Sequence, residues 1–149
     1  SPRTRSSPSP GGESVPATLV DSSVLLDVLT EDSVWFEWSS TALAACADEG
    51  PLVLNPIVYA EASIRFSTIE DLDEALAADF ERSPLPWAAA FLAGKCFVAY
   101  RKRGGTKTAP LPDFYIGAHA AVEGLRLRTR DPGRYRSYFP NLALITPRK

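Results

Sequence analysis

Four acidic residues lie beside the apolar runs of this sequence, where α/β proteins place ligand-binding groups. They are Asp21, Glu61, Asp113 and Asp131. Parallel sheets bind ligands at the carboxyl ends of their strands, so a suitable strand order would bring these four carboxylates together. Oxygen ligands of this kind suit Mg²⁺ or Mn²⁺, and such an ion activates water and neutralises phosphoryl oxygens. The pattern therefore predicts metal-dependent hydrolysis of a phosphodiester.

Each acidic residue also has a simpler explanation. Asp21 and Asp113 stand where helix N-caps are expected, Glu61 fits a solvated helix face, and Asp131 begins an Asp-Pro-Gly turn. Spacing alone does not distinguish four separate structural roles from one shared site. The prediction of a site therefore depends on the fold that positions the acids.

Short apolar runs alternate with helical patterns along the chain. Strands are predicted at 17–20, 52–54, 125–129 and 142–145, with a weaker signal at 80–85. Helices are predicted at 24–29, 34–48, 56–66, 69–80, 86–101 and 114–123. This alternation favours a three-layer α/β/α sandwich with a mainly parallel, about five-stranded central sheet.

Local signals indicate where several helices begin. Asn55-Pro56 combines an N-cap with a proline at the first helical position, where its missing N–H costs nothing. Ser22 or Ser23 can cap the first helix, and Asp113 the last one. The stretch between the fourth and fifth strands is predicted as a loop.

Length and composition indicate one folded domain. The chain has 149 residues, of which 45% are hydrophobic and 23% charged. Residues 1–16 are rich in Ser, Pro and Gly and are predicted to form a flexible tail before a domain at 17–149. No membrane span or secretory leader is expected, which predicts a cytoplasmic protein. Cys46 and Cys96 form no CxxC motif, which argues against a zinc ribbon.

Charge is divided unequally along the chain. Residues 21–94 carry fourteen acidic and two basic side chains, whereas residues 95–149 carry twelve basic and three acidic ones. The basic part either forms a solvated face or attracts a polyanion such as RNA. The candidate RNA contacts are Lys102, Arg103, Lys107, Arg130, Arg134 and Arg136.

Four segments, in this order, resemble PIN-domain ribonucleases of the VapC toxin type over about residues 18–147: LVDSSVLLDVL, NPIVYAEA, LPDFYIGAHAAVEGLRLRTRD and RYRSYFPNLALITP. The resemblance implies that the four acidic residues hold Mg²⁺ or Mn²⁺ and that a metal-activated water cleaves RNA. It also implies supporting hydroxyl groups at Ser23, with Ser22 as second choice, and at Thr129.

The same resemblance implies a biological setting. The protein would be the toxin of a type II toxin–antitoxin module, cleaving tRNA or rRNA and thereby inhibiting translation and growth. Its partners would be a VapB-like antitoxin and a second copy in a homodimer. The aromatic face formed by Trp35, Phe36 and Trp38 is a candidate surface for either partner.

Other functions fit less well. An aspartyl-phosphate phosphatase needs a second acid where Ser23 stands, and a phospho-receiver needs an aspartate where Asn55 stands. His119 is the single histidine, too few for a metal-free ribonuclease that uses two. The tyrosines are interpreted as packing residues more than base-stacking ones: Tyr115, Tyr135 and Tyr138. The main alternative is a non-catalytic PIN-like module that binds RNA or protein.

Overall fold

The computed structural model describes residues 16–76 and 80–147, so the predicted tail at 1–16 lies outside the described residues except for Pro16. One sheet of five strands, all paired in parallel, has the order β3-β2-β1-β4-β5. The strands are β1 (Thr18–Val20), β2 (Leu52–Leu54), β3 (Phe80–Arg82), β4 (Arg126–Arg128) and β5 (Leu144–Ile145). The predicted α/β class and strand number are confirmed, although β3 ends at Arg82 and not at residue 85.

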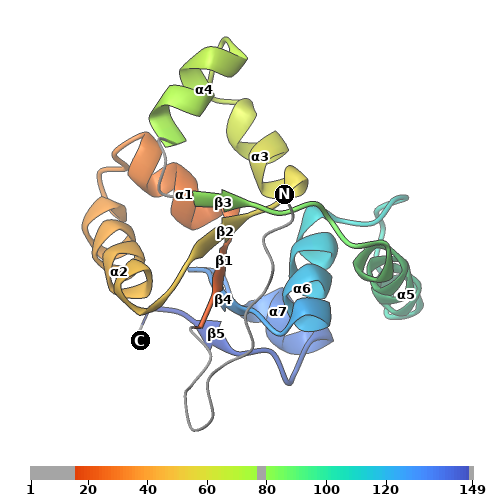
Figure 1. Cartoon of the computed structure of the whole chain (residues 1–149). Coiled ribbons are helices and arrows are strands. Elements are labelled where there is room, and N and C mark those ends of the chain that lie inside the picture. Colours follow the sequence, from red (N-terminus) through yellow and green to blue (C-terminus); the bar gives the residue numbers. More distant parts are fainter. Residues whose placement is uncertain (1–15, 77–79, 148–149) are drawn as a thin grey trace, which may run out of the picture.

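Helices cover both faces of the sheet and complete the three predicted layers (Figure 1). One face carries α1 (Ser22–Leu29) and α2 (Phe36–Glu49). The other carries α5 (Trp87–Lys102), α6 (Pro112–Glu123) and α7 (Gly133–Tyr138). Two further helices, α3 (Pro56–Ser63) and α4 (Ile69–Leu76), lie above the sheet in Figure 1.

Some predicted helix bounds are wrong. The second helix begins at Phe36 and not at residue 34, because the Asp32 carboxylate accepts the N–H groups of Val34 and Trp35 and holds a turn there. The third helix ends at Ser63, three residues early. The fourth ends at Leu76 within the described residues, and positions 77–79 of its prediction lie outside them.

Helix α7 lies where a loop was predicted. It spans only six residues, and its N-cap Pro132 makes no side-chain capping bond. So short a helix has no apolar periodicity that a sequence pattern could detect. Its position matters because it carries Tyr135 and Arg134 to the carboxyl edge of the sheet.

The N-caps of α1, α3 and α6 can be compared with the predicted ones. Asn55 caps α3 as expected, its Oδ1 accepting the Val58 N–H at 2.9 Å. For α1 the sequence offered two alternatives. Asp21 is the cap, as one of them predicted, and the predicted serine cap is wrong because Ser22 is the first helical residue. The predicted Asp113 cap of α6 is also wrong, because Leu111 holds that position. Asp113 instead lies in the first turn, where the helix dipole favours a negative charge.

Two arginines of β4 lie on the sheet face covered by α2. Arg126 forms an ion pair with Glu49, with Nη1 to Oε1 at 2.7 Å. Arg128 is buried, donates from Nη2 to the Ala42 carbonyl at 3.1 Å, and lies 5.4 Å from the ring centre of Trp38. Its Nε has no hydrogen-bond partner among the described residues. Charged side chains therefore occupy a face that apolar ones usually fill in a parallel sheet.

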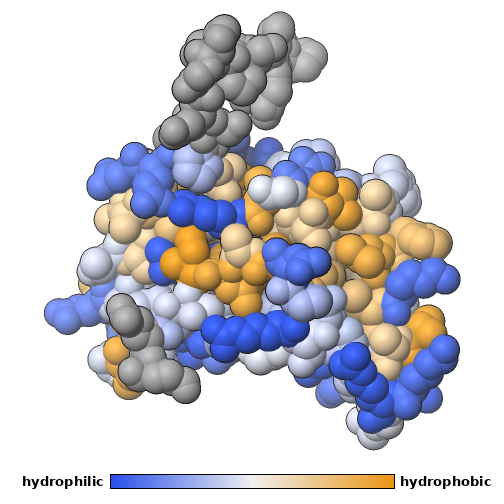
Figure 2. Space-filling model, turned by 90° about the horizontal axis from the view of Figure 1, so that it is seen from below, coloured by the Kyte–Doolittle hydropathy of each residue, from blue (hydrophilic) through white to orange (hydrophobic). Residues whose placement is uncertain are grey.

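The outer surface mixes apolar and charged side chains. Figure 2 shows apolar residues near the centre of the face seen from below, with strongly hydrophilic ones beside them. Trp87 and Phe91 of α5 are 91% and 68% exposed. Within 16–76 and 80–147, none of the helices combines the length and apolar character that crossing a bilayer requires.

Candidate active site

Asp21 is the most buried of the four predicted acids, with 5% of its surface exposed. It directly follows β1, and its carboxylate accepts three hydrogen bonds: from the Ser22 N–H at 2.8 Å, Thr129 Oγ1 at 2.7 Å and Ser23 Oγ at 3.3 Å. Burial, with the nearby carboxylates of Asp113 and Glu61, nevertheless raises its pKa to about 6, against the effect of the bonds from Thr129 and Ser22. Asp21 is therefore a partly desolvated acid held in one orientation.

Glu61 faces Asp21 from α3. Its Oε1 accepts a 2.6 Å hydrogen bond from Ser22 Oγ, on the first residue of α1. Burial raises the pKa of the Glu61 carboxyl, and the charge of Asp113 adds to this shift. The prediction favoured Ser23 over Ser22 as the supporting hydroxyl; the structure places Ser23 on Asp21 and Ser22 on Glu61.

Asp113 approaches from the opposite layer, in the first turn of α6. Burial raises the pKa of its carboxyl and Asp131 adds to the rise, while Arg134 and Tyr135 oppose it. The Arg134 guanidinium is the nearby counter-charge, with Nε 3.6 Å from Asp113 Oδ2. Three elements distant in sequence thus bring Asp21, Glu61 and Asp113 within electrostatic range of one another.

Asp131 lies at the rim. Its side chain is 72% exposed and lies 3.9 Å from Arg130 Nη1. Thr129 connects this rim to the centre, because Oγ1 donates to Asp21 and accepts the Asp131 backbone N–H at 3.1 Å. Thr129 is fully buried, and its hydroxyl contacts Asp21, the carboxylate of the site for which the resemblance implied a supporting hydroxyl here.

The Tyr135 hydroxyl also lies among the acids, a role that the sequence did not reveal. The side chain is 1% exposed, and its hydroxyl is 3.4 Å from Asp113 Oδ1. Burial and the charges of Asp21, Asp113 and Glu61 raise the pKa of this hydroxyl far above its ordinary value. Tyr135 therefore keeps its proton and acts as a neutral donor. The one sequence feature that could have indicated this position is that Tyr135 follows the Asp131-Pro132 turn by three residues.

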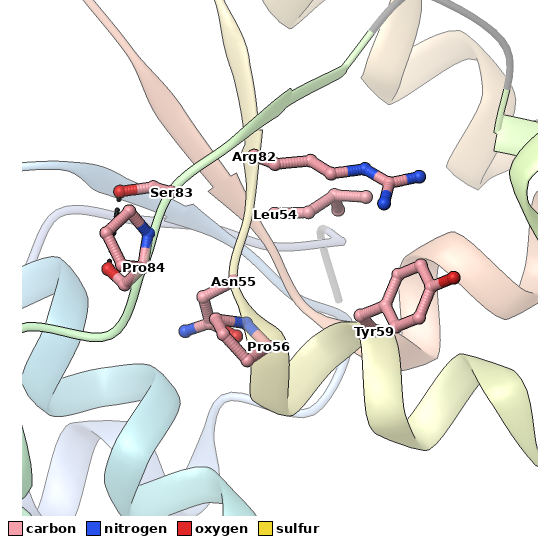
Figure 3. A pocket seen from close by; sticks show the side chains of 7 residues that line it. All are labelled: Leu54, Asn55, Pro56, Tyr59, Arg82, Ser83 and Pro84. Carbon is pink, nitrogen blue, oxygen red and sulfur yellow. Dashed lines mark hydrogen bonds between the residues drawn. The ribbon is translucent and has the colours of Figure 1, made fainter. Parts of the chain in front are cut away.

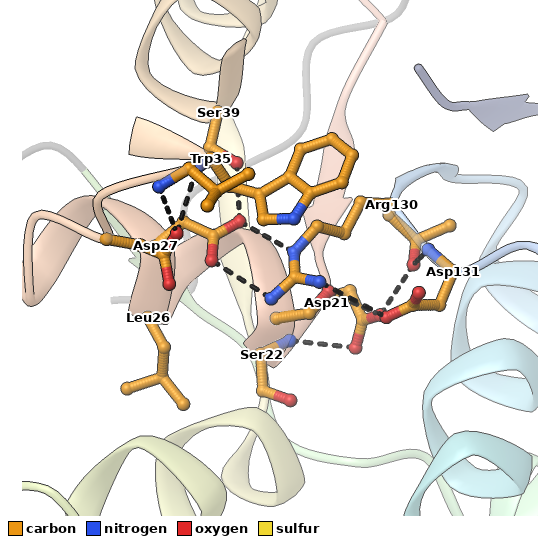
Figure 4. A network of polar contacts seen from close by, with 12 residues as sticks. Asp21, Ser22, Leu26, Asp27, Trp35, Ser39, Arg130 and Asp131 are labelled. Atoms are coloured by element: carbon orange, nitrogen blue, oxygen red, sulfur yellow. Dashed lines mark hydrogen bonds and ion pairs between the residues drawn. The ribbon is translucent and has the colours of Figure 1, made fainter. Parts of the chain in front are cut away.

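The predicted RNA-contacting residues differ in their surroundings. Arg130 is partly buried and paired within the protein: Nε lies 2.8 Å from Asp27 Oδ2, and the guanidinium lies over the Trp35 ring (Figure 4). Arg134 is partly exposed between Asp113 and the rings of Tyr100 and Phe114. The remaining four are exposed on α5, the loop after it and α7: Lys102, Arg103, Lys107 and Arg136.

His119 belongs to the core. Because Asn55 Oδ1 caps α3, Asn55 Nδ2 faces His119 Nδ1 at 3.0 Å and donates to it. This arrangement assigns the imidazole proton to Nε2, which is buried without a partner among the described residues. Burial lowers the pKa of His119, so the ring is neutral and structural.

The side-chain oxygens around Asp21 are of the type that binds a hard divalent cation, since they belong to carboxylates and hydroxyls. In the described part of the chain, however, no group of three or more Asp, Glu, His or Cys side chains is already arranged to hold a metal ion. Placing these charges here has a cost, which the raised pKa values reflect: burial is its main cause, and the charges of neighbouring carboxylates add to it. A cation would remove that cost.

The fold and the site together indicate a class of protein: a parallel α/β sandwich with acidic residues from the end of β1, from α3 and from α6 at the carboxyl edge of the sheet. The family model for the PIN domain matches residues 18–139, and the chain therefore belongs to the PIN domain family. A comparison with curated protein sequences gave no significant match.

Several solved structures share the fold. VapBC2 from Rickettsia felis, bound to a DNA fragment from its promoter, is 18% identical, with a TM-score of 0.67 over 89% of this chain and 99% of that one. A toxin–antitoxin complex from Klebsiella pneumoniae is 22% identical, with a TM-score of 0.60 over 89% and 98%. VapBC-1 from nontypeable Haemophilus influenzae is 18% identical, with a TM-score of 0.62 over 87% and 97%.

Proposed function

We propose that this protein is a metal-dependent endoribonuclease and the toxin of a VapC-type toxin–antitoxin module. The observation that carries the proposal is that Asp21, Glu61 and Asp113 meet at the carboxyl edge of the sheet, where Ser22 joins the first two elements by its bond to Glu61. Burial, together with the charge of Asp113, raises the pKa of both Asp21 and Glu61 there. Membership of the PIN domain family and the likeness to toxin–antitoxin complexes support it.

In this proposal the same three carboxylates, with Asp131 at the rim, would hold Mg²⁺ or Mn²⁺. The ion, when bound, supplies an activated water and neutralises phosphoryl oxygens. The chain's own groups orient the ligands: Thr129 fixes one oxygen of Asp21, and Ser22 fixes one of Glu61. Such outer hydrogen bonds determine which carboxylate oxygens remain free to bind a cation.

The proposed partners are based on the proteins with similar structures. A VapB-like antitoxin is proposed because the similar structures are complexes of toxins with antitoxins. We also propose a homodimer, a tRNA or rRNA substrate, and action in the cytoplasm. The half-buried rings of Trp35 and Trp38 pack edge to face at 6.0 Å and lie over arginines, so any partner would contact a preformed surface there.

Cleavage of total RNA by purified, antitoxin-free protein tests the function. With Mg²⁺ or Mn²⁺ we expect discrete fragments, whose ends identify the substrate, and with EDTA none. Asp113→Ala should lose cleavage because it removes one proposed ligand. RNA that is bound but never cut would favour the alternative, a non-catalytic PIN-like module. Cutting that survives both EDTA and the substitution would contradict the proposed site.

Tyr135→Phe should weaken Mn²⁺ binding by about tenfold, the lower end of what losing a hydrogen-bond partner of a metal ligand costs. The change removes the hydroxyl beside Asp113 and keeps the buried ring. Isothermal titration with Mn²⁺ measures it. Tyr138→Phe is the control, because Tyr138 lies on the same helix and packs its ring on Phe114. Equal Mn²⁺ affinity in both variants would refute a positioning role for Tyr135.

Replacing Arg134 and Arg136 by alanine should weaken RNA binding more at low salt than at high salt. Charges that follow the RNA backbone release counterions, so their removal lowers the salt dependence as well as the affinity. Binding of a labelled RNA to the Asp21→Asn protein at several salt concentrations measures both. An equal loss at every salt concentration would argue against backbone contacts by these arginines.

A further inference from the structure

A second site lies beside the acidic one, at the carboxyl ends of β2 and β3. It is a pocket of about 350 Å³, near the lower end of the range for small-ligand sites. We propose that this pocket binds one unpaired nucleobase of the RNA, an inference that rests on the proposed ribonuclease function. Its lining residues are Leu54, Asn55, Pro56, Tyr59, Arg82, Ser83 and Pro84 (Figure 3).

Two flat groups in the pocket are held in place before any ligand arrives. Arg82 lies 4.9 Å from the ring centre of Tyr59, and both side chains point to the same side in Figure 3. Asp73 of α4 fixes them both: its Oδ1 accepts from Arg82 Nη2 at 2.7 Å and from the Tyr59 hydroxyl at 2.8 Å. An aromatic ring and a guanidinium plane are the groups on which proteins stack single-stranded bases.

The charge balance favours a base over a phosphate. The positive charge of Arg82 is already paired with Asp73, so the pocket offers no free cation to a phosphoryl group. Most other walls are apolar, and the Asn55 side chain is engaged in the protein, because it donates to His119 and accepts from Val58. A neutral, largely apolar pocket beside a flat platform suits an uncharged planar ligand.

The two sites share one edge of the sheet. β1 and β2 are hydrogen-bonded neighbours with Leu19 opposite Val53, so the positions after them, Asp21 and Asn55, lie on adjacent strands. Helix α3 contributes to both sites, since Glu61 contacts Ser22 while Tyr59 lines the pocket. Residues 59 and 61 leave α3 on different faces, because they are two positions apart on a helix. An RNA strand with a phosphate at the acids would therefore pass the start of α3, by Asn55 and Pro56, to bring a base to Tyr59.

The test is a cycle that removes the ring, the base, or both. The RNAs are single-stranded 12-nucleotide oligomers of one sequence that the wild-type protein cuts or binds, each lacking a single base at one position. Binding is measured with Asp21→Asn protein, which is not expected to cut the RNA, alone and combined with Tyr59→Leu. We expect the loss of the base at one position to weaken binding to the Asp21→Asn protein, which keeps Tyr59, by roughly tenfold or more. The same position should make little difference to the Tyr59→Leu protein.

Two further variants separate stacking from structure. Tyr59→Phe keeps the ring and loses the bond to Asp73, so it should retain most of the base dependence and remains informative if Tyr59→Leu unfolds. Phe91→Leu removes another aromatic ring, which is exposed on α5 and has Lys95 5.0 Å from its centre. This variant should leave the base dependence intact.

The outcomes are distinct for the two proposals. Wild-type protein that neither cuts nor binds RNA overturns the ribonuclease and the base pocket together. RNA that is cut or bound with the same abasic profile for Tyr59 and Tyr59→Leu overturns only the base pocket. That result would leave the pocket to an apolar side chain of a protein partner.

Discussion

Asp21→Asn is expected to lower RNA cleavage by about a thousandfold or more and, in the metal-free protein, to raise the free energy of unfolding above pH 6. The loss of activity follows from removing the central carboxylate of the proposed metal site. The gain in stability has a separate cause. Asp21 is 5% exposed, beside Asp113 and Glu61, and an amide avoids both the desolvation and the repulsion of a charge there.

The pH dependence follows from the direction of the pKa shift. The pKa of Asp21 rises from 3.8 to about 6 on folding, so the native state binds more protons than the unfolded state between these values. Stability of the wild-type protein therefore falls as pH rises from about 4 to about 6, and it stays lower above pH 6. The advantage of Asp21→Asn should grow over that interval to about 1–3 kcal/mol.

Urea unfolding at pH 4.5 and pH 8, in EDTA and in saturating Mg²⁺, measures this trade-off. Mg²⁺ should stabilise the wild-type protein, because it binds only the folded state, and should have little effect on Asp21→Asn. Asp27→Asn is the comparison for the effect of Mg²⁺ on stability. It also removes a buried carboxylate, here of α1, but one that lies outside the acidic site. Equal stability of wild type and Asp21→Asn at pH 8 in EDTA would contradict the proposed repulsion.

Asp27→Ala should destabilise the protein by about 3 kcal/mol or more, because it leaves the guanidinium of Arg130 without its partner. Asp27 is 2% exposed and accepts from Arg130 Nε at 2.8 Å, from Arg130 Nη2 at 3.1 Å and from Ser39 Oγ at 2.7 Å. This pair joins α1 to the segment between Thr129 and Asp131. The loss should therefore also loosen the rim of the candidate site.

Thermal and urea unfolding measure the effect of Asp27→Ala, and a double variant supplies its control. Adding Arg130→Met removes the unpaired charge and should restore part of the lost stability. If Arg130 instead served mainly to bind RNA, Asp27→Ala would leave the free energy of unfolding almost unchanged. The same variants then show whether RNA binding depends on Arg130 once stability is accounted for.

The sequence predicted the positions of the acids better than their surroundings. Asp21 and Asn55 follow short apolar runs, so strand ends and the α3 cap could be recognised locally. The partner of Arg130, in contrast, lies 103 positions earlier in the chain, and no local pattern reveals such a contact. The sequence therefore offered only a solvated face or an RNA contact for Arg130, and not an ion pair with Asp27.

The missed role of Tyr135 has a similar origin. An aromatic residue near the end of a domain is usually a packing residue, and Tyr135 is indeed buried. What the sequence could not show is which way its hydroxyl points, because that depends on α7, a helix of six residues without a capping signal. Its polar end reaches Asp113 while its ring fills the core.

The arginines on β4 have a consequence for how precisely a very short strand can be placed. Arg126, Arg128 and Arg130 alternate with Leu127 and Thr129, and each arginine has a partner beside α1 or α2. A slip of one residue would turn these charges toward the opposite layer and expose Leu127 to α2. Charge thus fixes the alignment of β4 where three residues of hydrophobic alternation are too few. Because Thr129 and Asp131 directly follow β4, their positions in the candidate site depend on the contacts that these arginines make with α1 and α2.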